Sequence, residues 1–374
     1  FSVGLNGTVE WDIINPDRRL EINIAKNKVE LEKLNYQMIE RDLYLEAVKT
    51  FFQIQASIQD IEIAKQAIEV SKIALVEAKN KFQAGIGNRL EVLEAETQLG
   101  RDKINLSNKN GQLKFNKNAL SKILDLKNEF NIDKTDNSKI FGFWNLDNTQ
   151  SLKIALKNRN DLKVKQKNIL INKLQGKSIL SSKKPQFTLY NNYSITNAYG
   201  ESGVIDVNKD NIVNSNSNTV GIKFELNLFD GGLTKQNFLS SIEKENQLIE
   251  ELNQNKLDIE NDIKNTLIKL KISKETIINS YAQSQSAREA LKISLVRLEA
   301  GLTTQREIVN LQGDVSEAES NYINSLTEYN ENLMKMVRLV GNDNYNLCNF
   351  SNKNETSFVK YAKKKDLSIC ELKT

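Results

Sequence analysis

The sequence predicts an α+β membrane protein in which β-strands of membrane length lead into long antiparallel α-helical hairpins. Two segments alternate strictly between apolar and polar residues, and a period of two indicates a strand with two different faces. Each segment is followed by a long stretch without glycine or proline, at residues 17–84 and 233–300. The two stretches have equal length and end at similar turns, so we expect two internal repeats.

The two alternating segments place apolar residues on one face and polar residues on the other. The apolar positions are Val3, Leu5, Val9, Trp11 and Ile13 in the first segment, and Val220, Ile222, Phe224, Leu226 and Leu228 in the second. About ten residues suffice for a tilted strand to cross a bilayer with its polar side chains toward a watery lumen. The charged residues predicted to face that lumen are Glu10, Asp12, Lys223 and Glu225. An ordinary antiparallel sheet with one solvated face would show the same alternation, so the pattern alone leaves both open.

A turn and a long helix follow each of these strands. The turns contain Asn15-Pro16-Asp17 and Asp230-Gly231-Gly232, which favour a change of chain direction. Each continuous helix would span roughly 100 Å at 1.5 Å per residue. Apolar residues recur along the helices at intervals of three, four or seven, as in Ile24, Leu31, Met38, Leu45 and Phe52. Such narrow seams indicate packing against neighbouring helices rather than burial in a globular core.

Both long helices are predicted to end at a glycine, Gly85 in the first repeat and Gly301 in the second. Glycine readily adopts the left-handed conformation that caps a helix C-terminus. Asn88 and Thr304 can then cap a returning helix, because their side chains accept hydrogen bonds from free backbone N–H groups. We expect the returning helices to extend to about residues 126 and 340. Each repeat therefore consists of a strand, a long helix, a tight turn and a helix back.

The second repeat has an additional helix and strand at its start. Residues 151–182 are predicted to form the helix, residues 187–196 a third alternating strand after Pro185, and residues 199–218 a loop. The chain then divides into four regions, which are a first repeat at 1–127, a connector at 128–150, a second repeat at 151–343, and a polar tail at 344–374 that we expect to be disordered. The tail holds both cysteines, Cys348 and Cys370, and whether they form a disulfide is left open.

Charge and composition exclude several functions. With 52 basic and 48 acidic residues the net charge is only +4, which argues against nucleic acid as a partner. There is no histidine, the commonest general base and metal ligand. The sequence shows no glycine-rich phosphate loop and no metal-spaced cluster either, so we expect neither an enzyme nor a metal or cofactor site. No apolar run reaches about 18 residues, so no transmembrane helix is expected.

In combination these features resemble the TolC-like outer-membrane efflux protein family, over most of the chain from Val3 to Gly341. The resemblance is carried by several segments, namely the strand leading into Leu228-Phe229-Asp230-Gly231-Gly232, the Ala-Gly turn followed by a hydrophobic and acidic stretch in both repeats, Ala155-Leu156 with Arg159, Asp161 and Leu162 before Pro185, and Leu339-Val340-Gly341. Asn160 departs from the family pattern, because a proline usually stands at its position.

The resemblance implies a homotrimer whose protomers share one β-barrel in the outer membrane and one α-barrel through the periplasm. The connector at 128–150 would form an equatorial region at mid-height. The implied partners are outer-membrane lipid, a periplasmic adaptor (membrane fusion) protein and an inner-membrane transporter, for whose substrates the channel is a passive exit duct. A soluble coiled-coil scaffold or tether without a pore would explain the helices equally well, but it would not need strands of membrane-barrel length.

The resemblance also implies that the two helix turns lie at the periplasmic tip, where acidic residues one helical turn apart surround the closed duct. The matching positions are Glu307 and Asn310 in the second repeat, and Glu91 and Glu94 in the first. A ring of like charges from three protomers would favour cations. Alternatively, these are ordinary exposed residues near a helix N-terminus, where acids interact well with the helix dipole. Gly85 and Gly301 mark the turns expected to dock the adaptor.

The start of the chain departs from the family pattern. The family's first repeat normally opens with a helix and a strand of its own, and three strands are visible here where the family has four. We expect the sequence, which begins at Phe1 without Met, to be a piece of a longer chain. The loss of one strand per protomer is the other explanation, and it would leave an edge in lipid that a closed barrel avoids.

Overall fold

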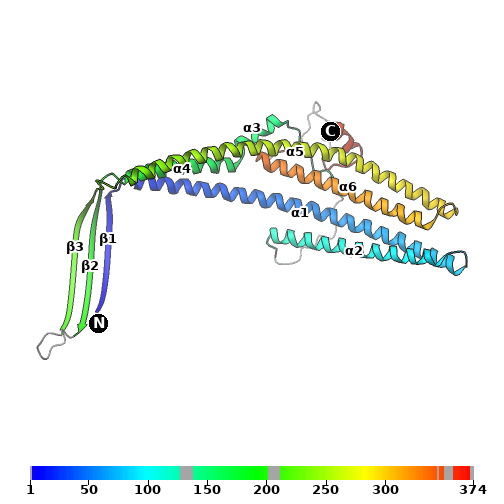
Figure 1. Ribbon diagram of the computed structural model, residues 1–374, viewed down its shortest axis with the longest axis horizontal. Helices are drawn as coiled ribbons and strands as arrows, with labels where there is room; N and C mark the ends of the chain where they lie inside the picture. The colour runs from blue at the N-terminus through cyan, green and yellow to red at the C-terminus, as the bar shows by residue number, and fades with distance from the viewer. Residues whose placement is uncertain (1, 127–137, 201–210, 343–344, 349–356, 371–374) are drawn as a thin grey trace. The chain divides into compact units, whose positions relative to one another are not determined.

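Long helices and a small antiparallel sheet make up the chain, shown as a computed structural model in Figure 1. The structure describes residues 2–126, 138–200, 211–342, 345–348 and 357–370. The elements in chain order are β1 (Ser2–Ile14), α1 (Arg18–Gln83), α2 (Arg89–Ile123), α3 (Asn148–Asn158), α4 (Asn160–Ser181), β2 (Gln186–Gly200), β3 (Asn211–Glu225), α5 (Leu233–Glu299), α6 (Gln305–Val340) and α7 (Ser357–Lys364). The predicted α+β class is confirmed. No helix in these ranges is both long enough and apolar enough to span a bilayer.

The chain forms two compact units, and α1 and α5 run through both. One unit contains Phe1–Tyr36 and Asp161–Asn255, and the other contains Gln37–Asn160 and Lys256–Thr374. Each unit therefore draws residues from both predicted repeats. The first part of the predicted connector, residues 128–137, lies outside the described residues.

The first unit holds the sheet, in which β1, β2 and β3 pair antiparallel in that order. The register aligns Asp12 with Thr188, and Thr188 with Lys223, so these polar side chains share one face. Trp11 and Ile222 belong to the neighbouring row, which lies on the opposite face because successive strand residues alternate. The structure thus confirms that the strands have two different faces.

Three predicted strand boundaries are wrong. β2 continues to Gly200 and β3 begins at Asn211, whereas the sequence predicts a loop at 199–218. The first half of β3 has the Asn- and Ser-rich composition of a loop. It pairs residue by residue with β2, however, and this ladder satisfies its backbone groups despite weak local strand preference. β3 also ends at Glu225, earlier than predicted.

Helix α4, in the same unit, contacts both long helices. Gly176 lies so close to α5 that a Cβ there would come within 2.6 Å of the Ser241 Oγ. Toward α1, the Ser178 hydroxyl donates a hydrogen bond of 2.8 Å to Asp17. Figure 1 shows α4 lying along α5. The start of each long helix is therefore anchored by the helix that precedes β2.

In the second unit each long helix lies beside its returning partner, α1 beside α2 and α5 beside α6 (Figure 1). Helix α6 also contacts α1, because the Ser320 hydroxyl donates to Asp60 at 2.9 Å and Arg338 donates to Asp42 at 2.6 Å. Lys109 of α2 pairs with the same Asp60 carboxylate at 2.5 Å. A single partly buried acid thus connects three helices.

A small residue recurs at every seventh position where each long helix meets its returning partner. In α1 these residues are Thr50, Ser57, Ala64, Ser71 and Ala78, and in α5 they are Thr266, Ser273, Ser280, Ala287 and Ser294. Small side chains allow two helices to approach closely. Their hydroxyls also bond across the interface, as where Asn116 of α2 donates to Ser57 at 2.9 Å. The prediction followed only the large apolar residues and missed this second seam.

The helix predicted at 151–182 is interrupted, so the prediction of one helix is wrong. Arg159 adopts an extended conformation, with φ −64° and ψ 125°, and separates α3 from α4. Its Nη1 donates to the Leu339 carbonyl at 3.1 Å. Just beyond, Gly341 ends α6 with a φ of 67° and passes so near that a Cβ would lie 3.5 Å from the Arg159 nitrogen. The interruption coincides with this tertiary contact, which local sequence does not encode.

The C-terminal tail contains a packed helix and a disulfide, so the prediction of disorder is wrong for its described part. The buried side chains of α7 are Phe358, Val359 and Ala362. A disulfide joins Cys348 to Cys370. The prediction failed because the tail is polar on average and its packing partners lie far earlier in the chain.

Candidate functional site

The two helix turns have the same backbone construction. Gly85 and Gly301 adopt positive φ values of 75° and 71°. After the first, the Ile86 N–H donates to the Lys81 carbonyl at 3.0 Å, and the equivalent bond after α5 measures 2.8 Å. This is the Schellman arrangement, in which the chain beyond a glycine satisfies the last free carbonyls of a helix. The predicted glycine caps are confirmed.

The returning helices are capped as predicted. The Asn88 side chain accepts the Leu90 N–H at 2.7 Å, and the Thr304 side chain accepts a backbone N–H of the first turn of α6. Gly87, which the prediction missed, lies against the end of α1. A Cβ at this position would come within 2.8 Å of the Lys81 Cβ. The first turn therefore requires two glycines, one for its conformation and one for space.

Glu94 is bound by Arg306 of α6, a residue that the prediction missed. The Arg306 Nε donates to one carboxylate oxygen at 3.2 Å and its Nη2 donates to the other. This paired contact joins α2 of one hairpin to α6 of the other. The hydrogen bond to Glu94, helped by the nearby charge of Glu91, raises the pKa of Arg306. No spacing rule connects these positions, because the contact depends on which hairpins are neighbours.

The other predicted gate residues differ in their surroundings. Glu307 is half-buried, and its carboxylate accepts hydrogen bonds from the Thr303 hydroxyl and, at 3.4 Å, from the Ser294 hydroxyl. Glu91 and Asn310 are exposed. The structure therefore brings Glu91 and Glu94 close to one arginine, and directs Glu307 back into its own hairpin.

Apolar side chains at the turns are exposed. Ile86 and Leu302, each one residue after a capping glycine, are 79% and 68% exposed. Leu90 and Leu93, at the start of α2, are also exposed. The residue after the glycine of a Schellman turn frequently packs back on its own helix. Here it leaves an apolar surface that is uncovered in the single chain.

The four charged residues predicted to face a lumen lie on one face of the sheet. They are Glu10, Asp12, Lys223 and Glu225. The Thr188 hydroxyl donates to Asp12 at 2.8 Å, and Lys223 pairs with Glu225 at 2.9 Å. The face is therefore polar across all three strands.

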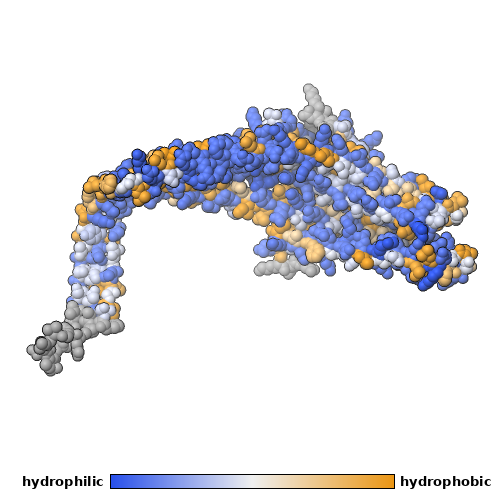
Figure 2. Space-filling model, viewed as in Figure 1, coloured by the Kyte–Doolittle hydropathy of each residue, from blue (hydrophilic) through white to orange (hydrophobic). Residues whose placement is uncertain are grey.

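The opposite face of the sheet carries exposed apolar side chains. The junction between strands and helices does so too, and it is orange in Figure 2. On the strands the exposed apolar residues include Val9, Trp11, Val220, Ile222 and Phe224. After β3, Leu228 and Phe229 are each 86% exposed. A contiguous apolar surface on an isolated chain indicates contact with lipid or with another protein.

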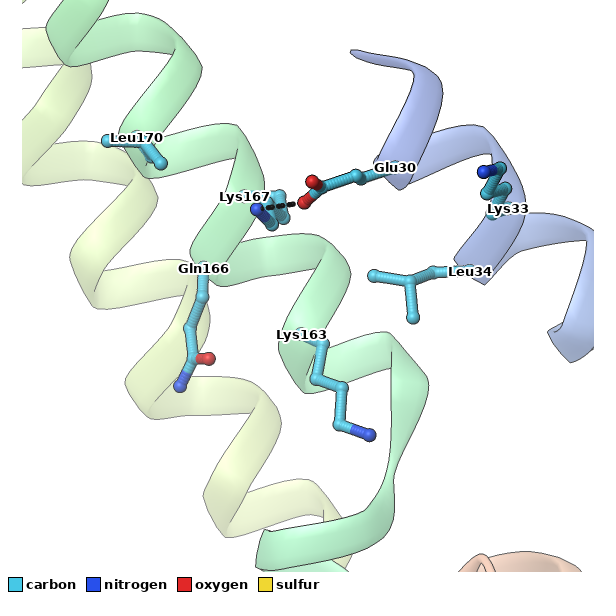
Figure 3. Close-up of a pocket in the computed structure, with 7 residues that line it drawn as sticks. All are labelled: Glu30, Lys33, Leu34, Lys163, Gln166, Lys167 and Leu170. Atoms are coloured by element: carbon cyan, nitrogen blue, oxygen red, sulfur yellow. Dashed lines mark hydrogen bonds and ion pairs between the residues drawn. The ribbon is translucent and has the colours of Figure 1, made fainter. Parts of the chain in front are cut away.

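An open groove in the first unit lies between α1 and α4 (Figure 3). It is lined by Glu30, Lys33 and Leu34 from α1, and by Lys163, Lys167 and Leu170 from α4. Lys167 donates to Glu30 at 2.5 Å and to Asn27 at 3.0 Å. Within the described ranges, no cluster of His, Cys, Asp or Glu could hold a metal ion.

Asp230 caps the start of α5 at the junction with the sheet. Its carboxylate accepts the N–H groups of Gly232 and Thr234, each at 3.0 Å, and the Lys183 Nζ lies 3.5 Å away. Hydrogen bonds from the Thr234 hydroxyl and N–H hold the pKa of the Asp230 carboxyl well below its ordinary value. The carboxylate is therefore the form that stabilises this junction.

The contribution of Asp230 to stability should depend on pH. Because its folded-state pKa is depressed, the contribution is fully present above about pH 4 and is lost as the pH falls toward that depressed pKa. We expect the midpoint of thermal unfolding, followed by circular dichroism in mild detergent, to drop by several degrees on acidification, and to drop less for Asp230→Asn. Glu243→Gln, which changes an exposed acid in the same helix, is the control. An equal pH dependence for wild type and Asp230→Asn would count against this role.

The fold is that of outer-membrane channels. It matches a membrane protein from Pseudomonas aeruginosa with a TM-score of 0.73 and 14% identity, over 91% of this chain and 83% of that chain. For the Campylobacter jejuni CmeC outer membrane channel the TM-score is 0.71 and the identity is 15%, over 98% of this chain and 80% of that channel. For the open state of the Neisseria gonorrhoeae MtrE outer membrane channel the TM-score is 0.68 and the identity is 12%, over 91% of this chain and 80% of that channel. At such identities the likeness concerns the fold alone.

Sequence comparison identifies the family. The model of the outer membrane efflux protein family matches residues 1–125 and 152–342, and the chain belongs to this family. The resemblance seen in the sequence is thereby confirmed. The family consists of channel proteins rather than enzymes, and membership implies the outer membrane as the location. A comparison with curated protein sequences gave no significant match.

Proposed function

We propose that the chain is one protomer of a homotrimeric outer-membrane channel. Three copies combine their strands into one β-barrel in outer-membrane lipid, and their long helices into an α-barrel that extends through the periplasm. The channel is a passive exit duct. An inner-membrane transporter delivers the substrate through a periplasmic adaptor (membrane fusion) protein, so the transporter selects what is exported.

The two-faced sheet is the observation that carries this proposal. Trp11 and Ile222 are 64% and 67% exposed on one face, while Asp12 and Lys223 lie on the other. Three strands are too few to close a barrel, which needs about eight or more. An open sheet edge is not tolerated in lipid. Copies of the chain joined edge to edge solve both problems, with the charged face lining a watery lumen.

The long helices support assembly in the same way. Helix α1 has exposed apolar residues at intervals of seven, which are Ile22, Val29, Tyr36 and Leu43. An apolar seam of this spacing fits against another helix. In an α-barrel a neighbouring protomer covers it. The matched turns and matched small-residue seams support the view that two repeats provide similar hairpins to each protomer.

We place the gate at the turns between α1 and α2 and between α5 and α6. The gate residues are Glu91, Glu94, Glu307 and Asn310. When three copies converge, the exposed Glu91 carboxylates form a ring that favours cations, while Arg306 offsets the charge of Glu94. The pairing of Arg306 with Glu94 holds the two hairpins of one protomer together and thereby favours a closed tip.

The same turns form the proposed docking surface for the adaptor. Gly85 and Gly301 give both turns one shape, and Ile86 and Leu302 expose apolar side chains beside them. Two similar surfaces on each protomer would offer six related positions around a trimer. A partner with an apolar helical tip fits such a surface, since the turns provide apolar contact without a deep pocket.

The proposal predicts how the chain fractionates. The full chain should sediment with outer membranes, resist extraction without detergent, and run as a trimer in mild detergent. Val220→Arg places a charge on the apolar face nearer the middle of β3, at a cost of about 2–4 kcal/mol near the bilayer midplane, and should reduce the recovered trimer severalfold. Thr219→Arg, on the polar face of the same strand, is the matched control and should assemble normally. A product that is soluble without detergent would favour the tether and reject the channel.

A further inference from the structure

Residues 138–147, here called the connector strip, are held against α6 by buried polar groups. The Asn330 side chain accepts the Phe141 N–H at 2.8 Å and donates to the strip carbonyl two residues earlier, also at 2.8 Å. The Tyr329 hydroxyl donates to the Gly142 carbonyl at 3.0 Å. Both α6 side chains are at most 2% exposed. The strip that leads into α3 is therefore a fixed part of the second unit.

The C-terminal segment covers the connector strip with two arms. The first arm, residues 345–348, accepts the Phe143 N–H at its Leu347 carbonyl, at 2.9 Å. The second arm, residues 357–370, pairs with Ile140, whose N–H donates to a second-arm carbonyl at 2.7 Å. Ile140 and Phe143 are 0% and 1% exposed. The arms thus complete the burial of the strip.

Aromatic side chains pack the second arm, whose helix α7 lies near the letter C in Figure 1. The Phe358 ring lies 5.9 Å from that of Phe143 and 5.8 Å from that of Tyr329, centroid to centroid. Tyr361 contacts Tyr281 of α5 at 6.4 Å. The arm therefore rests on the connector strip and on both α5 and α6.

The disulfide joins the two arms, and its two cysteine residues differ in exposure. Cys348 belongs to the first arm and is exposed, whereas Cys370 belongs to the second arm and is 5% exposed. Thiol–disulfide exchange requires an attacking thiolate to reach one of the sulfurs. Attack from solvent therefore reaches Cys348 first.

We propose that the Cys348–Cys370 disulfide is a redox lock on the connector strip, which opens and closes by exchange at Cys348 with a dithiol–disulfide exchange protein. Oxidised, the lock keeps both arms on the strip. Reduced, the second arm keeps its packing and its backbone hydrogen bonds to Ile140 but loses the covalent link to the first arm, so it detaches more often.

The exchange balances as a two-electron reaction. In opening, a partner thiolate attacks the Cys348 Sγ and forms a mixed disulfide, and the bond to the Cys370 Sγ breaks. The electron pair stays on the Cys370 Sγ, which takes up a proton. The partner's second thiol then loses its proton and attacks the mixed disulfide, and Cys348 leaves as a thiolate that is protonated. The partner dithiol becomes a disulfide, and closure is the reverse.

The order of attack can be tested on the wild-type full chain. The oxidised protein in mild detergent is treated briefly with reduced glutathione, quenched with acid, alkylated and mapped by mass spectrometry. Because access governs the attack, we expect glutathione on Cys348 at least about ten times more often than on Cys370. Equal labelling, or more glutathione on Cys370, would overturn entry through Cys348.

The effect of the lock is tested by hydrogen exchange on the same protein, oxidised and fully reduced. The disulfide closes a loop between two cysteines that are 22 residues apart in sequence. From the usual stabilisation by such a cross-link, we expect reduction to speed hydrogen exchange about 100-fold in residues 138–147 and 357–370. Peptides from the turn between α1 and α2 serve as the internal control and should not change. The double variant Cys348→Ser/Cys370→Ser should show the fast pattern without reductant. Unchanged exchange in the strip after reduction, or in the double variant, would overturn the lock.

Discussion

Reversing the charge of Arg306 (Arg306→Glu) is expected to raise the single-channel conductance severalfold in planar bilayers. In the wild type Arg306 joins α6 to Glu94 of α2, and Glu91 lies within reach of its charge. Reversal replaces an attraction between the hairpins by repulsion among acids, three times over in a trimer. The closed tip loses its link and widens, so each channel should pass more current.

A charge swap provides the control for this result. Glu94→Arg combined with Arg306→Glu restores opposite charges at the two positions, and it should return the conductance toward the wild-type value. Arg297→Glu makes the same charge change on a nearby exposed arginine of α5 and should have little effect. If Arg306→Glu conducts like the wild type, or if the swap remains as open as the single variant, the link does not hold the tip.

Truncating Tyr329 (Tyr329→Ala) is expected to lower the free energy of unfolding by about 3–5 kcal/mol, the usual cost of removing a large buried ring. Tyr329 is 0% exposed, contacts Phe358 and donates to the Gly142 carbonyl. Burial raises its pKa, so the hydroxyl remains a donor. Denaturant unfolding in mild detergent, followed by circular dichroism, measures the loss.

Two further variants separate packing from hydrogen bonding at this position. Tyr329→Phe keeps the ring and leaves the Gly142 carbonyl without its donor, so it should cost about 1–2 kcal/mol. Glu328→Ala, at the exposed neighbouring position, should change stability by no more than about 0.5 kcal/mol. A loss below about 1 kcal/mol for Tyr329→Ala would show that the connector strip does not depend on this anchor.

Features governed by local chemistry could be predicted from the sequence. Two long stretches without glycine or proline and with apolar seams predict α1 and α5, and they end at Gly85 and Gly301 as expected. Asn88 and Thr304 cap the returning helices because capping depends only on a side chain and the next turn. The alternation of apolar and polar residues predicts the two faces of the strands, because successive side chains of a strand point to opposite faces.

Features that depend on distant partners could not be predicted. The first half of β3 is a strand because β2 lies beside it, although its own residues favour a loop. The contact of Glu94 with Arg306 depends on the neighbouring hairpin. The packed second arm depends on the connector strip, more than half the chain away. In each case the deciding free energy comes from a tertiary contact, which local propensity does not contain.

The small residue at every seventh position of α1 and α5 restricts how the length of these helices can change. Deleting or adding one residue rotates all later positions by about 100°, which would bring a large side chain into a contact that accepts only Ser, Thr or Ala. Deleting or adding seven residues keeps the small side chains at the helix contact and changes the helix length by about 10.5 Å. The returning helices must change by the same amount to keep their partners. The length of each hairpin is therefore expected to vary by whole heptads, with one heptad added to the long helix and one to its returning partner.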